Sequence, residues 1–178
     1  MKIALFAYSR QGCQTARTVM SFFSQEDIKA HTMERFGEEG FAPIRRPAKP
    51  FYSDLFSWAD AMVFIGSCGI AVREIAPHVR DKQTDPAVIC IDELGRFVIP
   101  LLSGHIGGAN EMALKIAAHI GATPVITTAT DINNRFSVDA WAARNNLTMD
   151  NIHRAKMVSA AILEEDIPLS CDFSITTD

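Results

Sequence analysis

Phe97-Val-Ile-Pro-Leu-Leu-Ser-Gly-His105-Ile-Gly-Gly-Ala109 joins an apolar strand to a helix through a short turn with three glycines. After this turn, apolar residues recur with the i, i+3, i+4 spacing of a helix that buries one face: Ala109, Met112, Ala113, Ile116, Ala117 and Ile120. The first N–H groups of such a helix lack internal partners and carry the positive end of its dipole. The pattern therefore predicts a strand–turn–helix unit in which His105 lies beside an anion-binding position.

Three other apolar strands end in similar polar or glycine-rich segments. These are Phe64–Arg73, Val125–Asp131 and Tyr8–Thr15. In open α/β sheets, ligands bind in the crevice outside the carboxyl ends of the strands. We therefore expect three loops to converge on one cleft at that edge of the sheet: Gly66–Gly69, Ser103–Gly108 and Thr127–Asp131.

The alternation of apolar strands with amphipathic helices predicts a three-layer α/β/α fold with a mainly parallel sheet, flavodoxin-like in style. We expect strands at 2–7, 29–33, 61–65, 87–91 and 97–102, and another that begins at Pro124. Helices are expected at 13–24, 52–58, 108–120, 138–144 and 151–164, with one more after Gly69. Residues 37–50 are expected to form a loop, and Asp92–Gly95 a hairpin turn. Residues 1–145 form the predicted domain, and 146–178 the incomplete start of a linker or a following domain.

Composition narrows the class of protein. The 178 residues are 48% hydrophobic, which supports a packed core, and the net charge of −4 argues against nucleic acid as a partner. No apolar run approaches the roughly 18 residues of a membrane span, and no signal peptide is recognisable, so a cytoplasmic location without a membrane partner is expected. The four cysteines have no metal-ligand spacing. Cys68, expected at a helix start, is the one we consider for chemistry.

Several segments resemble the N-terminal region of the cobalt-precorrin-5A hydrolase family, the CbiG-type proteins of anaerobic cobalamin synthesis. They are Gly66-Ser-Cys-Gly-Ile-Ala-Val-Arg73, Ile75-Ala-Pro-His78, Asp85-Pro-Ala-Val88, Asp92-Glu-Leu-Gly95, Phe97–His105, Gly107-Gly-Ala-Asn110 and Pro124–Asp131. The resemblance runs from about Ala61 to Trp141, in order and in spacing. Family members commonly continue into a C-terminal domain, so that domain or a second chain is an expected partner, and a homodimer is compatible with the sequence.

The resemblance implies a hydrolase that opens the ring-A δ-lactone of a cobalt-corrinoid intermediate and releases the C20 unit as acetaldehyde. The substrate carries its own cobalt, so neither a cofactor nor a protein-bound metal is expected. His105 is the first candidate for the catalytic base, and Asp92, Glu93 and Asp131 are the others. The amides of Gly107 and Gly108 are the candidate oxyanion donors. The remaining candidates would bind the substrate: Gly66, Ser67, Cys68, Gly69, Arg73, Ser103, Gly104, Asn110, Thr127 and Thr128.

Simpler structural roles and other functions remain open. Asp92 and Glu93 can be turn residues, and Thr127 and Thr128 can cap a helix. The segment from Ser9 to Gly12 is also compatible with the phosphate loop of a flavodoxin-like FMN-binding electron carrier. A further alternative is a non-catalytic corrinoid-binding domain that needs a second domain for turnover.

Overall fold

The computed structural model describes residues 1–145, 147–168 and 170. It divides the chain into two compact units, Met1–Ile126 and Thr127–Asp178. The division predicted at residue 145 stays a prediction. The end of the predicted second segment, residues 171–178 with Cys171, lies outside the described residues.

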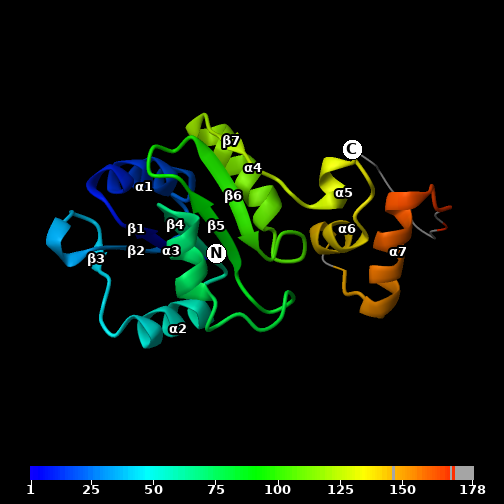
Figure 1. Cartoon of the computed structure of the whole chain (residues 1–178), viewed down its shortest axis with the longest axis horizontal. Coiled ribbons are helices and arrows are strands. Elements are labelled where there is room, and N and C mark those ends of the chain that lie inside the picture. Colours follow the sequence, from blue (N-terminus) through cyan, green and yellow to red (C-terminus); the bar gives the residue numbers. More distant parts are fainter. Residues whose placement is uncertain (146, 169, 171–178) are drawn as a thin grey trace. The chain divides into compact units, whose positions relative to one another are not determined.

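A seven-stranded sheet forms the centre of the first unit (Figure 1). Its strands are β1 (Lys2–Ala7), β2 (Asp27–Thr32), β3 (Ala42–Pro43), β4 (Ala61–Ile65), β5 (Ala87–Ile91), β6 (Phe97–Leu102) and β7 (Thr123–Pro124). They lie in the order β3-β2-β1-β4-β5-β6-β7. Every neighbouring pair is parallel except β5 and β6. The predicted α/β fold with a mainly parallel sheet is therefore confirmed.

Helices cover both faces of this sheet. One apolar cluster joins alternate strand residues such as Ile3 and Leu5 to α1 (Arg10–Phe22) and α4 (Ala109–Ile120). The other joins residues such as Ala4 and Phe6 to α2 (Ala48–Trp58) and α3 (Cys68–Ile75). Successive strand residues point to opposite faces of the sheet. Because both faces are covered, β4, β5 and the part of β1 after the exposed Lys2 are apolar and buried.

The predicted hairpin at Asp92–Gly95 is present, and it determines where the next loop lies. Gly95 has φ +68°, a conformation that glycine adopts without strain. The hairpin makes β6 antiparallel to β5, with Ile91 paired to Val98 and Val88 to Leu102. Residues after Leu102 therefore lie at the amino end of β5, where the Ser103 hydroxyl donates a hydrogen bond to the Asp85 carbonyl at 3.0 Å.

This direction corrects one expectation. The Gly66–Gly69 loop follows β4, at the edge of the sheet formed by the carboxyl ends of β4 and β5. The Ser103–Gly108 loop follows β6, at the opposite edge, formed by the amino ends of β4 and β5. The five residues of β5 separate the two edges by roughly 16 Å. The prediction that these loops converge on one cleft is wrong, because a short hairpin can connect only antiparallel neighbours.

Other differences concern element boundaries. Helix α1 begins at Arg10, three residues before the predicted start, because the Ser9 side chain caps it by accepting a hydrogen bond from the Gly12 amide. The predicted loop at 37–50 contains the short edge strand β3 and the first turn of α2. Strand β7 is only two residues long, and part of the segment after it forms helix α5 (Ala129–Ile132).

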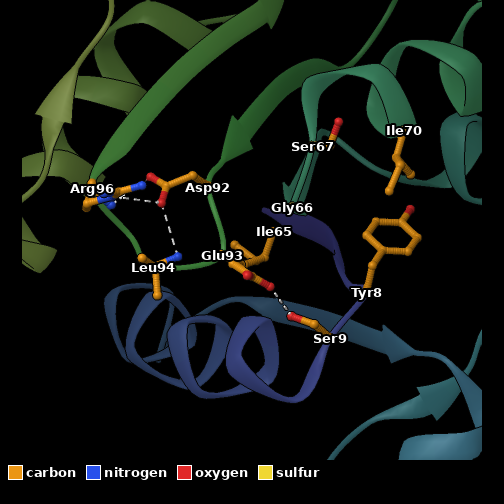
Figure 2. A pocket seen from close by; sticks show the side chains of 10 residues that line it. All are labelled: Tyr8, Ser9, Ile65, Gly66, Ser67, Ile70, Asp92, Glu93, Leu94 and Arg96. Atoms are coloured by element: carbon orange, nitrogen blue, oxygen red, sulfur yellow. Dashed lines mark hydrogen bonds and ion pairs between the residues drawn. The ribbon is translucent and has the colours of Figure 1, made fainter.

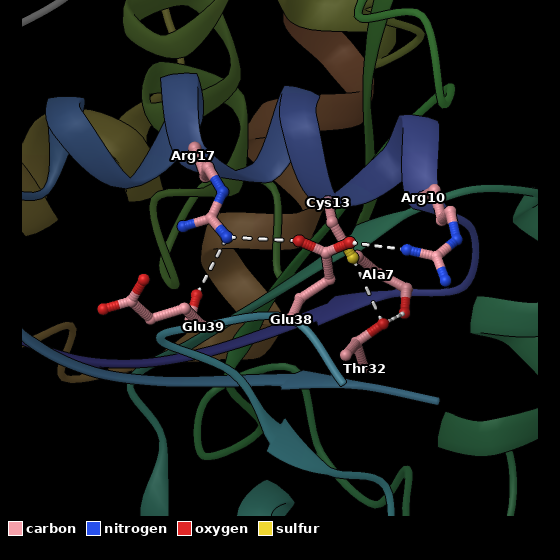
Figure 3. A network of polar contacts seen from close by, with 7 residues as sticks. All are labelled: Ala7, Arg10, Cys13, Arg17, Thr32, Glu38 and Glu39. Carbon is pink, nitrogen blue, oxygen red and sulfur yellow. Dashed lines mark hydrogen bonds and ion pairs between the residues drawn. The ribbon is translucent and has the colours of Figure 1, made fainter. Parts of the chain in front are cut away.

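A network of polar contacts connects the segment after β2 to helix α1 (Figure 3). Glu38 accepts hydrogen bonds from Arg10 and Arg17, each at 3.3 Å. The Thr32 hydroxyl donates to the Ala7 carbonyl at 2.9 Å and lies 3.2 Å from the Cys13 sulfur. The segment that contains the 3-10 helix η1 (Glu34–Phe36) is thereby held against α1.

In the described part of the second unit, the regular elements are helices joined by loops. Besides α5 it contains α6 (Val138–Arg144) and α7 (Ile152–Glu164), and α7 contacts both of the others. An ion pair between Arg135 and Asp166 at 2.7 Å lies within this unit. In the described part of the chain, no helix combines the length and the apolar character that crossing a bilayer requires.

Candidate functional site

An open cleft of about 440 Å³ lies at the carboxyl edge of the sheet (Figure 2). It lies beyond the ends of β1 and β4, which are neighbours in the sheet, and the chain order of the strands reverses between them. Such a reversal is the position where open α/β sheets bind ligands. The lining residues are Tyr8, Ser9, Ile65, Gly66, Ser67, Ile70, Asp92, Glu93, Leu94 and Arg96. Four predicted site residues, Gly66, Ser67, Asp92 and Glu93, are thus brought together here.

Two helices begin at this cleft, each capped by a serine. Ser9 caps α1, and Ser67 caps α3 by accepting a hydrogen bond from the Gly69 amide at 3.2 Å. The Ser9 hydroxyl also donates to the Glu93 carboxylate at 2.6 Å. Glu93 thus places its negative charge in front of α1, where the helix dipole is favourable to an anion.

Asp92 stabilises the hairpin turn. Its carboxylate accepts hydrogen bonds from the amides of Leu94, Arg96 and Phe97 at 3.1, 2.7 and 2.7 Å. Partial burial acts to raise the pKa of this carboxyl group, but the three amide bonds outweigh it, and the pKa is lowered overall. A carboxylate held in this way is a weak proton acceptor, so the geometry favours the structural role for Asp92.

Tyr8 forms one wall of the cleft. A β-carbon on Gly66, which has φ +151°, would lie 3.3 Å from the Tyr8 ring, so the glycine lets the ring pass close to the end of β4. The Tyr8 hydroxyl lies 2.7 Å from the Tyr52 hydroxyl of α2. Tyr8 and Ser9 follow β1, whereas Arg96 lies 87 residues later, just after the hairpin turn. The sequence alone did not single out Tyr8 or Arg96 as site residues.

The first turns of α3 contain three further candidates. Cys68 is the first residue of this helix and is half-buried, and it forms no disulfide bond with the other described cysteines. A β-carbon on Gly69 would lie 3.8 Å from an Arg73 guanidinium nitrogen, so the Arg73 side chain extends back toward the start of the helix. Cys68, Gly69 and Arg73 therefore lie near the cleft without lining it.

The Ser103–Gly108 loop, at the opposite edge, is closely packed on itself. A β-carbon on Gly107 would lie 2.4 Å from the Ser103 β-carbon, and one on Gly104 would lie 2.8 Å from the Asn110 side-chain oxygen. Ser103 and Asn110 are both buried, and Ser103 has φ +56°, which is uncommon for a residue other than glycine. These glycines are explained by packing alone.

His105 is half-buried in this loop. Its carbonyl accepts a hydrogen bond from the Gly108 amide at 3.0 Å. That bond closes the turn that leads into α4, so the Gly108 amide is used within the loop. The role of the Gly107 and Gly108 amides as oxyanion donors stays a prediction.

The remaining candidates belong to the second unit. Thr128 precedes α5 without a side-chain capping bond, although its carbonyl accepts from Ile132 at 3.1 Å. Asp131 lies within α5, and Thr127 is the first residue of the unit. Among residues 1–145, 147–168 and 170, no three His, Cys, Asp or Glu side chains are grouped so as to hold a metal ion.

Comparison with known proteins identifies relatives that match most of the chain. Residues 51–131 match the family model described as Cobalamin synthesis G N-terminal. The chain is 42% identical over 153 residues to the cobalt-precorrin-5A hydrolase of Salmonella typhimurium. The aligned residues cover 86% of this chain and 43% of the relative. It is 36% identical over 166 residues to the cobalt-precorrin-5A hydrolase of Priestia megaterium, covering 92% of this chain and 44% of the relative.

A solved structure of a cobalamin biosynthesis protein G homolog from Sulfolobus solfataricus superposes with a TM-score of 0.54 at 23% identity, covering 97% of this chain and 51% of the other. This likeness concerns the fold. The chain spans less than half the length of the two curated relatives. Residues 51–131 form a cobalamin synthesis G N-terminal domain, and the chain is homologous to the N-terminal part of cobalt-precorrin-5A hydrolases.

Proposed function

We propose that this chain contributes to cobalt-precorrin-5A hydrolysis, in which the ring-A δ-lactone is opened and the C20 unit leaves as acetaldehyde. The observation that carries the proposal is the 42% identity with the Salmonella typhimurium hydrolase along 86% of the chain. The substrate supplies its own cobalt, so the chemistry required of the protein is acid–base catalysis and charge stabilisation.

The cleft at the ends of β1 and β4 is the proposed place of reaction. A lactone carbonyl bound there would meet Glu93, whose carboxylate is exposed to solvent and held by Ser9. Glu93 is better suited than Asp92 to take a proton from water, because the Asp92 oxygens are already bonded to three amides. The proposed substrate-binding groups are Gly66, Ser67, Cys68, Gly69 and Arg73, at and near the start of α3.

His105 defines a rival place of reaction. The backbone of Ser103, two residues earlier, has φ +56°, and conformations of this kind cost energy and are found often at functional sites. Ser103, Gly104, Gly107, Gly108 and Asn110 would then position the substrate. Thr127, Thr128 and Asp131 belong to the second unit and stay candidates by themselves. Because His105 and Glu93 lie at opposite edges of the sheet, they cannot serve the same reacting atoms.

A non-catalytic role in binding the corrinoid is the second candidate function. It is supported by the extent of the match, which covers 43% and 44% of the two hydrolases. The FMN-binding alternative is less favoured. A phosphate at the start of α1 would meet the Glu93 carboxylate, which lies 2.6 Å from the Ser9 hydroxyl.

One assay separates turnover from binding. The purified chain is incubated with cobalt-precorrin-5A, alone and together with the remaining part of a full-length relative, while acetaldehyde and the visible spectrum of the corrinoid are followed. Acetaldehyde release by the chain alone supports a hydrolase. A spectral change without acetaldehyde, with release restored by the added part, supports the binding domain. If acetaldehyde release and the spectral change are both absent from both samples, the proposal is contradicted.

A further inference from the structure

We infer that the Tyr8 hydroxyl is the hydrogen-bond donor that holds the lactone carbonyl oxygen, and the oxyanion that forms from it, in the cleft. The inference rests on the proposed function and gives a role to a residue that lines the cleft beside Gly66. Figure 2 shows the Tyr8 side chain at the wall of the cleft beside Ile70. Tyr52, whose hydroxyl lies 2.7 Å from that of Tyr8, is a positioning residue.

The pairing of the two phenols leaves one proton available. Each hydroxyl carries one proton, and the 2.7 Å hydrogen bond between them uses one of the two. Within residues 1–145, 147–168 and 170, neither hydroxyl has another hydrogen-bond partner. When Tyr52 donates to Tyr8, the Tyr8 proton is left without an acceptor in the protein. A ligand oxygen in the cleft would satisfy it.

The surroundings keep both phenols protonated. Burial, with smaller effects from the neighbouring phenol and from Glu74, raises the pKa of Tyr8 above its ordinary value. Burial also raises the pKa of Tyr52 to about 12. A phenol that stays neutral can donate a hydrogen bond at any physiological pH and cannot act as a base. A bond from Tyr52 also polarises the Tyr8 hydroxyl, which strengthens it as a donor.

The reaction step balances with residues of the same cleft. Water oxygen adds to the lactone carbonyl carbon while Glu93 takes one water proton, and the carbonyl oxygen becomes an oxyanion bonded to Tyr8. The oxyanion collapses, the ring carbon–oxygen bond breaks, and the departing alkoxide takes the proton back from Glu93. The products are a carboxyl group and an alcohol. Tyr8 thus takes the part expected of the Gly108 amide, which the His105 carbonyl already occupies.

Matched removal of the two hydroxyl groups tests the inference. In Tyr8→Phe the donor is lost, and we expect kcat for acetaldehyde release to fall by about 10²–10³-fold, as for other oxyanion donors. KM should change little, because the bond strengthens in the transition state. In Tyr52→Phe the Tyr8 hydroxyl remains, and we expect a loss of about 10-fold or less. Circular dichroism and the thermal midpoint confirm that both variants are folded.

A purely structural role for the pair predicts a different result. Either substitution removes the same hydrogen bond, so equal losses in the two variants would overturn the inference. Full activity in Tyr8→Phe, beside an active wild-type protein, would also overturn it while leaving the proposed function intact. A wild-type protein that releases no acetaldehyde, even with the remaining part of a relative added, would refute the proposed function and this inference together.

Discussion

Protonation of His31 should make the first unit unstable in weak acid. His31 lies in β2, is 8% exposed, and stacks on Phe6 with ring centroids 5.7 Å apart. Burial, and then the charges of Arg45 and Lys29, lower the pKa of its imidazole from 6.5 to about 4. The Pro43 carbonyl opposes this shift only weakly, because neither ring nitrogen has a hydrogen-bond partner in the described part of the chain.

The direction and size of the effect follow from these values. Well above pH 6.5 the imidazole is neutral in both the folded and the unfolded state, so it adds no dependence on pH. Below pH 6.5 the unfolded chain binds a proton that the folded protein does not bind until pH is near 4, so stability is lost as pH falls through this window. The loss attributable to His31 should reach about 2 kcal/mol at pH 5 and about 3 kcal/mol near pH 4.

A comparison of two proteins isolates this contribution. Urea unfolding is followed by Trp58 fluorescence in a Trp141→Phe background, at pH 7.5 and at pH 5, with His31 present or replaced by leucine. The His31→Leu variant has no imidazole to titrate at this position, whatever its stability at pH 7.5. Between pH 7.5 and pH 5, its free energy of unfolding should therefore fall by about 2 kcal/mol less than that of the protein with His31. Equal losses in the two proteins would refute the reasoning, because other groups would then account for the whole pH dependence.

Further substitutions test the hairpin and the two edges of the sheet. Asp92→Ala should lower the free energy of unfolding by about 1–3 kcal/mol in urea titrations, because three amides lose their acceptor; a change below about 0.5 kcal/mol would show that the turn does not depend on the carboxylate. Gly107→Ala should lower the free energy of unfolding by about 1–3 kcal/mol, because the new β-carbon would overlap Ser103. In Gly69→Ala the new β-carbon meets only ordinary contacts, so this variant should be as stable as the parent protein or slightly more stable. Similar thermal midpoints for the two glycine variants would contradict the packing assigned to the Ser103–Gly108 loop.

The strands of the sheet could largely be predicted from sequence because burial on both faces leaves a simple pattern. β4, β5 and β6 have the predicted bounds, since each is an apolar run limited by turn residues. β3 was not predicted, because two exposed residues at a sheet edge leave no apolar signal. The early start of α1 depends on the Ser9 cap, which a search for apolar spacing overlooks.

The candidate site was harder to predict because it depends on strand direction and on contacts between distant residues. The hairpin at Asp92–Gly95 was predicted, and it already implies that β6 is antiparallel and that Ser103 lies away from Gly66. That implication was available from the sequence. The pairing of Tyr8 with Tyr52 was not, because 44 residues separate them and only the packing of α2 on the sheet brings their hydroxyl groups together.

A single-turnover measurement tests most directly whether the reaction takes place in the cleft. It compares the rate of acetaldehyde release from cobalt-precorrin-5A between the Glu93→Gln and His105→Ala variants. Glu93→Gln keeps the shape of the side chain but removes the proton acceptor, and the rate should fall by about 10²–10⁴-fold. His105→Ala, at the opposite edge, should lose less than about 10-fold. A large loss in His105→Ala beside a nearly unchanged Glu93→Gln would contradict the assignment and place the reaction at the Ser103–Gly108 loop.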